Sequence, residues 1–162
     1  MPDGPRPNGP RYEDDFYAWT QYQAEVLRAM PAPDNRFDRE HVAEEIEALG
    51  RAALHDVYGL VRGIVTHFLL LAHGPSGNVR YGWMREIVVA RAELEDKMSP
   101  TIWLLTQAEL PELYNDGREI AELRLRELGA IEAARNLPKH SAYSLDDICQ
   151  DDWYPEPPGE ET

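Results

Sequence analysis

Residues 38–73 read DREHVAEEIEALGRAALHDVYGLVRGIVTHFLLLAH. Apolar side chains recur in this stretch at steps of three or four residues: Val42, Ile46, Leu49, Ala53, Val57, Leu60, Ile64, Phe68 and Leu71. Because an α-helix turns once in about 3.6 residues, these steps place all of them on one side of a helix. The pattern therefore predicts a single long helix from about Asp38 to His73.

The second half of this helix carries a second apolar row, which predicts that it is buried more deeply than the first half. The members of that row are Leu54, Tyr58, Val61, Val65 and Leu69. Three glycines lie in the same helix, and each costs about 1 kcal/mol relative to alanine. We expect Gly59 and Gly63 to let a neighbouring helix approach closely, and a kink at Gly50 is equally open.

Two further amphipathic helices lie on either side of the long helix in the sequence. The first runs from Tyr12 to Met30 and carries the row Tyr12, Phe16, Trp19, Val26 and Met30. The second follows the Gly/Pro loop 74–78 and carries the row Trp83, Ile87, Ala90, Leu94 and Met98. Each row has the spacing of one helix face, so both are expected to face the core.

The remaining helices are predicted from their end signals. Ser99-Pro100 is typical of a helix start and predicts a short helix to about Gln107, and Pro111 begins another that ends near Gly129. The stretch from Ser144 to Asp147 resembles a capping box that opens a last short helix. Since no stretch alternates as a strand does, the sequence predicts an all-α fold, a single-domain bundle of about six helices with one long central helix.

The composition restricts the functional classes. The chain has 162 residues, 30 acidic against 16 basic side chains, a formal net charge of −14 and one cysteine. A lone cysteine excludes an internal disulfide framework and a zinc site made of cysteines. The acidic balance argues against a general nucleic-acid binder and against binding to an anionic membrane.

Proline and charge define the predicted tails. Four prolines lie in the first ten residues and three in the last eight, while the stretch from Asp146 to the end has seven acidic residues and no Lys or Arg. We predict a disordered Pro/Gly-rich tail over residues 1–11, a helical domain over 12–154 and a disordered acidic tail over 155–162. No secretory signal is recognised, and the most apolar stretch (63–72) is too short to span a bilayer, so a cytoplasmic location is expected.

No pattern of catalytic or metal-binding residues emerges. His41, Glu44 and Glu45 have helical spacing, but the chain has no Glu-x-x-His repeat and these side chains are predicted to face solvent. A solvated acidic face is the preferred interpretation, with a metal site as the alternative. His67 falls on the apolar side, where a core histidine bonded to a carbonyl or hydroxyl is favoured over a general base. Cys149 has acidic neighbours and makes a poor nucleophile. We therefore predict no catalytic residue, no metal and no cofactor.

Several segments of the chain share their motifs with one family of proteins: Tyr12–Trp19 with Gln21 and Gln23, His41–Arg51, Trp83, Ser99-Pro100, Tyr143–Asp147 and Asp151–Pro155. In these segments the chain resembles the bacterial domain-of-unknown-function 29 family. The resemblance spans about residues 12–156, and its most specific part is the run Glu-Glu-Ile-Glu-x-Leu-Gly-Arg. This chain departs from it at Leu71-Ala72, where many members have Lys-Trp. The resemblance implies a helical bacterial protein and no established activity.

The functional hypothesis is a non-catalytic, acidic helical protein that binds another protein. An acidic antitoxin-like inhibitor of a basic nuclease is one form of it, and a second copy of the chain is one candidate partner. The candidate interaction surface comprises His41, Glu44, Glu45, Trp153 and Tyr154. Trp153 and Tyr154 have a second interpretation, as an anchor that holds the tail on the bundle. The alternative function is a metal- or small-ligand-binding bundle with hydrolase activity.

Overall fold

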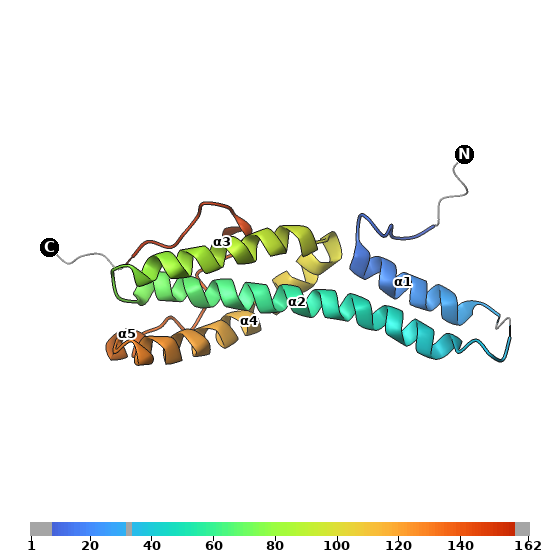
Figure 1. Cartoon of the computed structure of the whole chain (residues 1–162), viewed down its shortest axis with the longest axis horizontal. Coiled ribbons are helices and arrows are strands. Elements are labelled where there is room, and N and C mark those ends of the chain that lie inside the picture. The colour runs from blue at the N-terminus through green and yellow to red at the C-terminus, as the bar shows by residue number, and fades with distance from the viewer. Residues whose placement is uncertain (1–7, 32–33, 158–162) are drawn as a thin grey trace. The chain divides into compact units, whose positions relative to one another are not determined.

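The computed structural model describes residues 8–31 and 34–157, and these residues form helices without any strand. The helices are α1 (Phe16–Ala29), α2 (Arg39–His73), α3 (Val79–Lys97), α4 (Pro100–Glu127), α5 (Ile131–Arg135) and α6 (Leu145–Cys149) (Figure 1). The all-α prediction, the number of helices and the single long helix are confirmed. Of the two predicted tails, residues 1–7 and 158–162 lie outside the described residues. Residue 8 contacts α1, because the Tyr22 hydroxyl donates to the Asn8 carbonyl at 2.5 Å.

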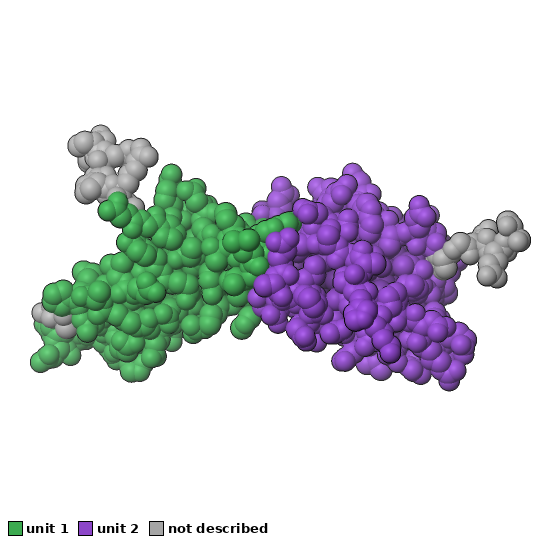
Figure 2. Space-filling model, turned by 180° about the vertical axis from the view of Figure 1, so that it is seen from behind, with its two compact units in different colours: residues 1–56, 98–105 green, residues 57–97, 106–162 purple. Residues whose placement is uncertain are grey.

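The chain divides into two compact units (Figure 2). Unit 1 comprises residues 1–56 and 98–105, and unit 2 comprises residues 57–97 and 106–162. The first half of α2 therefore belongs to unit 1 and its second half to unit 2. Each unit is described by itself below.

In unit 1, α1 packs against the first half of α2 through small residues. Gly50 lies so close to α1 that a Cβ atom on it would be 2.1 Å from the Thr20 hydroxyl oxygen. Thr20, Ala24 and Ala43 are fully buried. Beside this contact, Gln21 Nε2 donates to the Glu47 carbonyl at 3.4 Å. The close approach thus occurs at Gly50, where α2 continues as a helix.

The rows predicted to be buried in unit 1 are displaced by about one residue from the buried ones. On α1 the buried positions are Thr20 and Ala24, while Tyr12 and Met30, which were predicted as the ends of this helix, lie outside it and are exposed. On α2 the buried positions are Ala43, Gly50 and Leu54, while Val42 and Leu49 are exposed. The physical reason is that small side chains let two helix backbones approach closely, and the larger apolar residues are then left beside the contact.

The glycines of α2 give the first testable prediction. Gly50→Ala gains about 1 kcal/mol of helix propensity, but its methyl group would overlap the buried Thr20 hydroxyl. Such overpacking costs about 1–3 kcal/mol, so the variant should be less stable than wild type by roughly 1 kcal/mol in urea unfolding.

Gly63→Ala is the matched control. Apart from its chain neighbours and the backbone of its own helix, no described atom lies within 4 Å of a Cβ placed at Gly63, so alanine there should stabilise the protein by about 0.5–1 kcal/mol. Combining Gly50→Ala with Thr20→Ala should recover part of the loss. Equal stabilisation by both single changes would show that α1 and α2 do not pack closely at Gly50. The predicted close approach of a neighbouring helix at Gly59 and Gly63 is wrong, because at neither position would a Cβ come closer than 4 Å to a neighbouring group.

Unit 2 encloses a larger apolar core, formed around the second half of α2. Its fully buried side chains include Ile64, Phe68, Leu69, Ile87, Leu125, Leu145 and Ile148. Helix α4 approaches α2 closely at Gly117, where a Cβ would lie 2.9 Å from the Arg62 carbonyl oxygen. The Thr66 hydroxyl lies 3.2 Å from the Gly117 carbonyl oxygen and donates across the contact. The predicted burial of this half of the long helix is confirmed.

Helix α4 differs from the prediction of two separate helices. It continues from Pro100 to Glu127 with Pro111 inside it. Proline removes only its own N–H from the ladder, and the Gln107 side of α4 is exposed, so water can serve the carbonyl that loses its donor. Gly129, with φ +76°, ends the helical segment as predicted. The Ser144–Asp147 capping box is also confirmed.

Candidate functional site

A row of apolar side chains remains at the solvent-exposed side of α2 in unit 1. Val42 and Leu49 are 38% and 58% exposed, and Ile46 and Ala53 between and after them are half-buried. We call these four residues the α2 stripe. At 100° per residue, Asp38, Glu45 and Asp56 fall along one edge of it. The stripe is therefore apolar in its centre and acidic along that border.

His41, Glu44 and Glu45 are all exposed. At 100° per residue, Glu45 borders the α2 stripe, His41 lies farther round the helix, and Glu44 falls on the side opposite the stripe. The His41 ring pairs with Asp38, three residues earlier in the chain, since His41 Nδ1 lies 2.6 Å from Asp38 Oδ2. This hydrogen bond, together with the negative charge of Asp38, raises the pKa of His41. In the described part of the chain, no group of three or more His, Cys, Asp or Glu side chains is arranged to hold a metal ion.

Glu47 lies on the other face of α2 and binds α1. Arg28 Nη1 and Nη2 donate to its two carboxylate oxygens at 2.5 and 3.2 Å, and Arg28 Nε donates to Glu40 at 2.8 Å. The hydrogen bond from Arg28 lowers the pKa of Glu47. The predicted pair within α2 is longer, with Arg51 Nη1 3.8 Å from Glu47. Of the acidic residues in the run 44–47, Glu47 is thus used inside unit 1, and Glu44 and Glu45 remain available to solvent.

In unit 2, a buried arginine holds the end of the folded chain. Arg91 on α3 is 4% exposed. Its Nε donates to the Ile148 carbonyl at 2.9 Å, and its Nη2 donates to the carbonyls of Asp147 and Trp153 at 3.0 and 2.8 Å. The guanidinium also lies over the rings of Phe68 and Tyr154, at 5.4 and 5.3 Å from their centroids. Desolvation lowers the pKa of Arg91, so these contacts compensate for the burial of a charge.

Trp153 and Tyr154 are therefore fixed to unit 2. The Trp153 ring packs edge-on against Phe68 and Tyr143, with centroids 5.2 and 6.1 Å apart. These contacts match the interpretation of the pair as an anchor. Sequence reasoning missed Arg91 because it assigned Ala90 to the buried row of α3. The steps from Ile87 to Arg91 and from Arg91 to Leu94 are four and three residues, which was the signal for a buried arginine.

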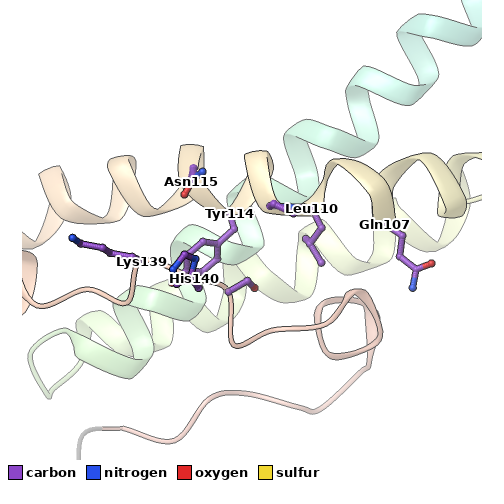
Figure 3. Close-up of a pocket in the computed structure, with 8 residues that line it drawn as sticks. Gln107, Leu110, Tyr114, Asn115, Lys139 and His140 are labelled. Carbon is purple, nitrogen blue, oxygen red and sulfur yellow. The ribbon is translucent and has the colours of Figure 1, made fainter.

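A pocket of about 440 Å³ lies between the middle of α4 and the segment that precedes Tyr143 (Figure 3). Its lining comprises Gln107, Leu110, Pro111, Tyr114, Asn115, Lys139, His140 and Ser141. The Tyr114 hydroxyl donates to the Pro138 carbonyl at 2.8 Å, which holds the two walls together. None of these residues was predicted as a site, since the two walls are distant in sequence.

The other candidate groups have ordinary structural surroundings. His67 Nδ1 lies 2.8 Å from the Gly63 carbonyl oxygen and donates to it, as predicted for a core histidine. Desolvation lowers the pKa of His67, which favours the neutral ring. Desolvation also raises the pKa of Cys149 to about 11, so its thiol stays protonated near neutral pH.

The sequence matches the profile of the domain of unknown function DUF29 over residues 11–154. The chain belongs to the DUF29 family. In the DUF29 fold, residues of the segments that carried the resemblance make contacts that hold the fold together. Asp15 from the first segment accepts hydrogen bonds from Ser99 and Thr101 at the start of α4. Glu47 from the second holds α1, and Tyr143 from the later segments packs against Trp153.

A solved structure supports the DUF29 fold independently. An α-helical protein of unknown function from Rhodospirillum rubrum ATCC 11170 is similar in structure, with a TM-score of 0.77. The two sequences are 26% identical, and the alignment covers 89% of this chain and 92% of that one. No functionally curated protein matches the sequence. The comparisons thus give the family and the fold.

Helix α2 is long and apolar enough to cross a membrane by length and composition alone. More than half of its most apolar window (56%) is buried inside this DUF29 chain. The buried side chains include Val61, Ile64, Val65 and Phe68, which face other parts of unit 2. A mostly buried core helix passes the same test of length and composition.

Proposed function

We propose that this DUF29 protein is a non-catalytic interaction protein that binds a partner protein through the α2 stripe. The observation that carries the proposal is the exposure of Val42 and Leu49, at 38% and 58%, in a helix whose adjacent face is packed against α1. Contiguous apolar side chains at the surface with a polar border are typical of protein interaction sites.

The charge of unit 1 indicates the chemistry of the partner. Residues 1–56 and 98–105 contain 12 acidic and 6 basic side chains. The border of the stripe is acidic, and its residues Asp38, Glu45 and Asp56 are exposed. The partner that fits is an amphipathic helix with lysine or arginine beside its own apolar row. A second copy of the chain fits less well, since two acidic borders would meet and repel each other.

An antitoxin-like inhibitor of a basic bacterial protein, acting in the cytoplasm, is the specific form of this proposal. An acidic surface attracts a basic partner at long range and increases the rate of association. The binding energy would then come from burial of Val42 and Leu49. This division predicts that salt slows association more than it speeds dissociation.

The test is capture of host proteins on the immobilised full-length chain, followed by binding measurements with the purified, identified partner. We expect Val42→Ser combined with Leu49→Ser to weaken binding at least about tenfold, since each removes an apolar contact of about 1 kcal/mol or more. Glu44→Gln with Glu45→Gln should lower the association rate and its dependence on salt.

The matched control is Ile120→Ser with Leu123→Ser in α4. These two side chains are 44% and 64% exposed, close to the values of the tested pair, but they lie in unit 2. The control should bind like wild type. A partner that binds the α2 variant and wild type equally, or absence of any specific partner, would contradict the proposal.

A further inference from the structure

The pocket beside Tyr114 carries positive charge in an acidic chain. It is lined by Lys139, one of two lysines in the sequence, and by His140. Among the described residues, none of the eight that line the pocket is acidic. The chain has a formal net charge of −14. The lining of this pocket, with a lysine and no acidic residue, therefore differs in charge from the protein as a whole.

The acidic residues of α4 point away from the pocket. At 100° per residue, Glu109, Glu112 and Asp116 fall on the side of the helix opposite to Gln107, Leu110, Pro111 and Tyr114. Contacts support this placement, because Asp116 Oδ2 lies 3.7 Å from Arg62 Nη1 of α2. The helix thus presents carboxylates on one side and a lining free of them on the pocket side.

The pocket also has an apolar wall and fixed geometry. Tyr114 is 1% exposed and its hydroxyl is bonded to the Pro138 carbonyl, so the ring cannot swing out without breaking that bond. Leu110 extends the apolar wall along α4 (Figure 3). Pro111, the next residue, also lines the pocket. On the other wall, the Ser141 hydroxyl donates to the Tyr143 carbonyl and accepts from the Tyr143 N–H, at 2.9 and 3.1 Å, which fixes the turn that follows Lys139 and His140.

We propose that this pocket binds a small organic carboxylate with a flat apolar body. Lys139 would face the carboxylate, and the side-chain amide of Asn115 would donate a hydrogen bond to it. Leu110 and Pro111 would contact the apolar body. A pocket of about 440 Å³ is within the usual range for small-molecule sites. This binding site is separate from the α2 stripe and does not depend on the proposed partner.

The test uses sodium benzoate as the probe and benzamide as its uncharged analogue. Titration of the isotope-labelled full-length protein, followed by two-dimensional NMR, should give saturable shifts at residues 107–115 and 139–141. Benzamide should bind about fivefold more weakly, the size of one charge contact at a partly exposed site. Lys139→Met should weaken benzoate binding by the same factor and leave benzamide binding unchanged.

Lys97→Met is the matched control, because it removes the only other lysine and changes the net charge equally. It should bind benzoate like wild type. The same titration on a chain ending at Pro157 tests whether residues 158–162, which include Glu160 and Glu161, occupy the pocket. Benzoate shifts that appear only in the shortened chain would overturn the proposal of an external ligand. Shifts elsewhere, or equal binding by Lys139→Met and wild type, would overturn it as well.

Discussion

Replacing Arg91 by methionine is expected to lower the free energy of unfolding by about 3 kcal/mol, which corresponds to roughly 6–12 °C in Tm for a chain of this size. Arg91 donates to three main-chain carbonyls, and all three belong to α6 or to the segment that follows it. Methionine fits between Phe68 and Tyr154 as an apolar side chain but donates no hydrogen bond. The loss of stability therefore comes from buried carbonyl oxygens that no longer receive a hydrogen bond.

The expected change is local as well as global. Amide hydrogen exchange should speed up most at Ile148 and at the residues up to Tyr154, because Arg91 is what joins them to α3. Exchange in α1 should stay as in wild type. Arg91→Lys should fall between the two, since lysine keeps the charge but not the planar group that lies over two rings.

Arg85→Met provides the control for Arg91. Arg85 lies on the same helix and is exposed, so the substitution changes the net charge equally without removing a buried contact. Its effect on stability should stay within about 0.5 kcal/mol. If Arg91→Met changed stability by less than 1 kcal/mol and left the exchange of residues 148–154 unaltered, the carbonyl contacts would not hold the chain end.

The length of α2 was predictable from sequence because it depends on periodicity along one segment. The buried face of the first half of α2 was not predictable in this way. Hydrophobicity selects Val42 and Leu49, whereas the buried positions are Ala43 and Gly50, with Gly50 against Thr20 of α1. Close approach depends on the shapes of two helices together, and a single helix pattern does not contain that information.

The pocket and the buried arginine were unpredictable for a related reason. Tyr114 and Pro138 are 24 residues apart, and Arg91 binds carbonyls 56 to 62 residues further along. Main-chain carbonyls are present at every residue, so the sequence does not show which of them an arginine will bind. Local signals did succeed where the contact is local, as in the capping box of Ser144 and Asp147.

The interaction residues predicted from sequence divide between the two units. His41, Glu44 and Glu45 are exposed in unit 1, and Glu45 borders the apolar stripe, so Glu45 fits the proposed surface. Trp153 and Tyr154 are in unit 2, where Arg91 and Phe68 hold them. The prediction of acidic and aromatic interaction residues as one surface is replaced by a proposal that uses the α2 stripe alone.

Replacing Asp15 by alanine is expected to cost about 2–3 kcal/mol, because this one carboxylate caps two helices. Oδ1 accepts from the Ala18 N–H in the first turn of α1 at 3.0 Å and from the Ser99 hydroxyl at 3.2 Å. Oδ2 accepts from the Thr101 N–H in the first turn of α4 at 2.8 Å. A typical cap contributes about 1 kcal/mol, and here the two caps also join separate segments of unit 1.

The dependence on pH tests the same contacts. Burial raises the pKa of Asp15, but the hydrogen bonds from Ala18, Thr101 and Ser99 outweigh it, so the pKa is lowered from 3.8. A carboxyl group with a lowered pKa in the folded state stabilises the protein fully above its unfolded pKa. That contribution is lost as the pH falls through the folded pKa. The stability difference between wild type and Asp15→Ala should therefore be constant from pH 7 to about 5 and shrink below about pH 4.

Asp15→Asn separates the two caps, since its amide has one acceptor oxygen where the carboxylate has two. If that oxygen stays with Ala18, the amide nitrogen faces the Thr101 N–H and two donors meet. The loss should be about half that of alanine and independent of pH in this range. Asp14→Ala is the control, because Asp14 is exposed and its ion pair with Arg11 is 3.6 Å long. Equal effects of Asp14→Ala and Asp15→Ala would contradict the double cap, because only Asp15 contacts the start of α4.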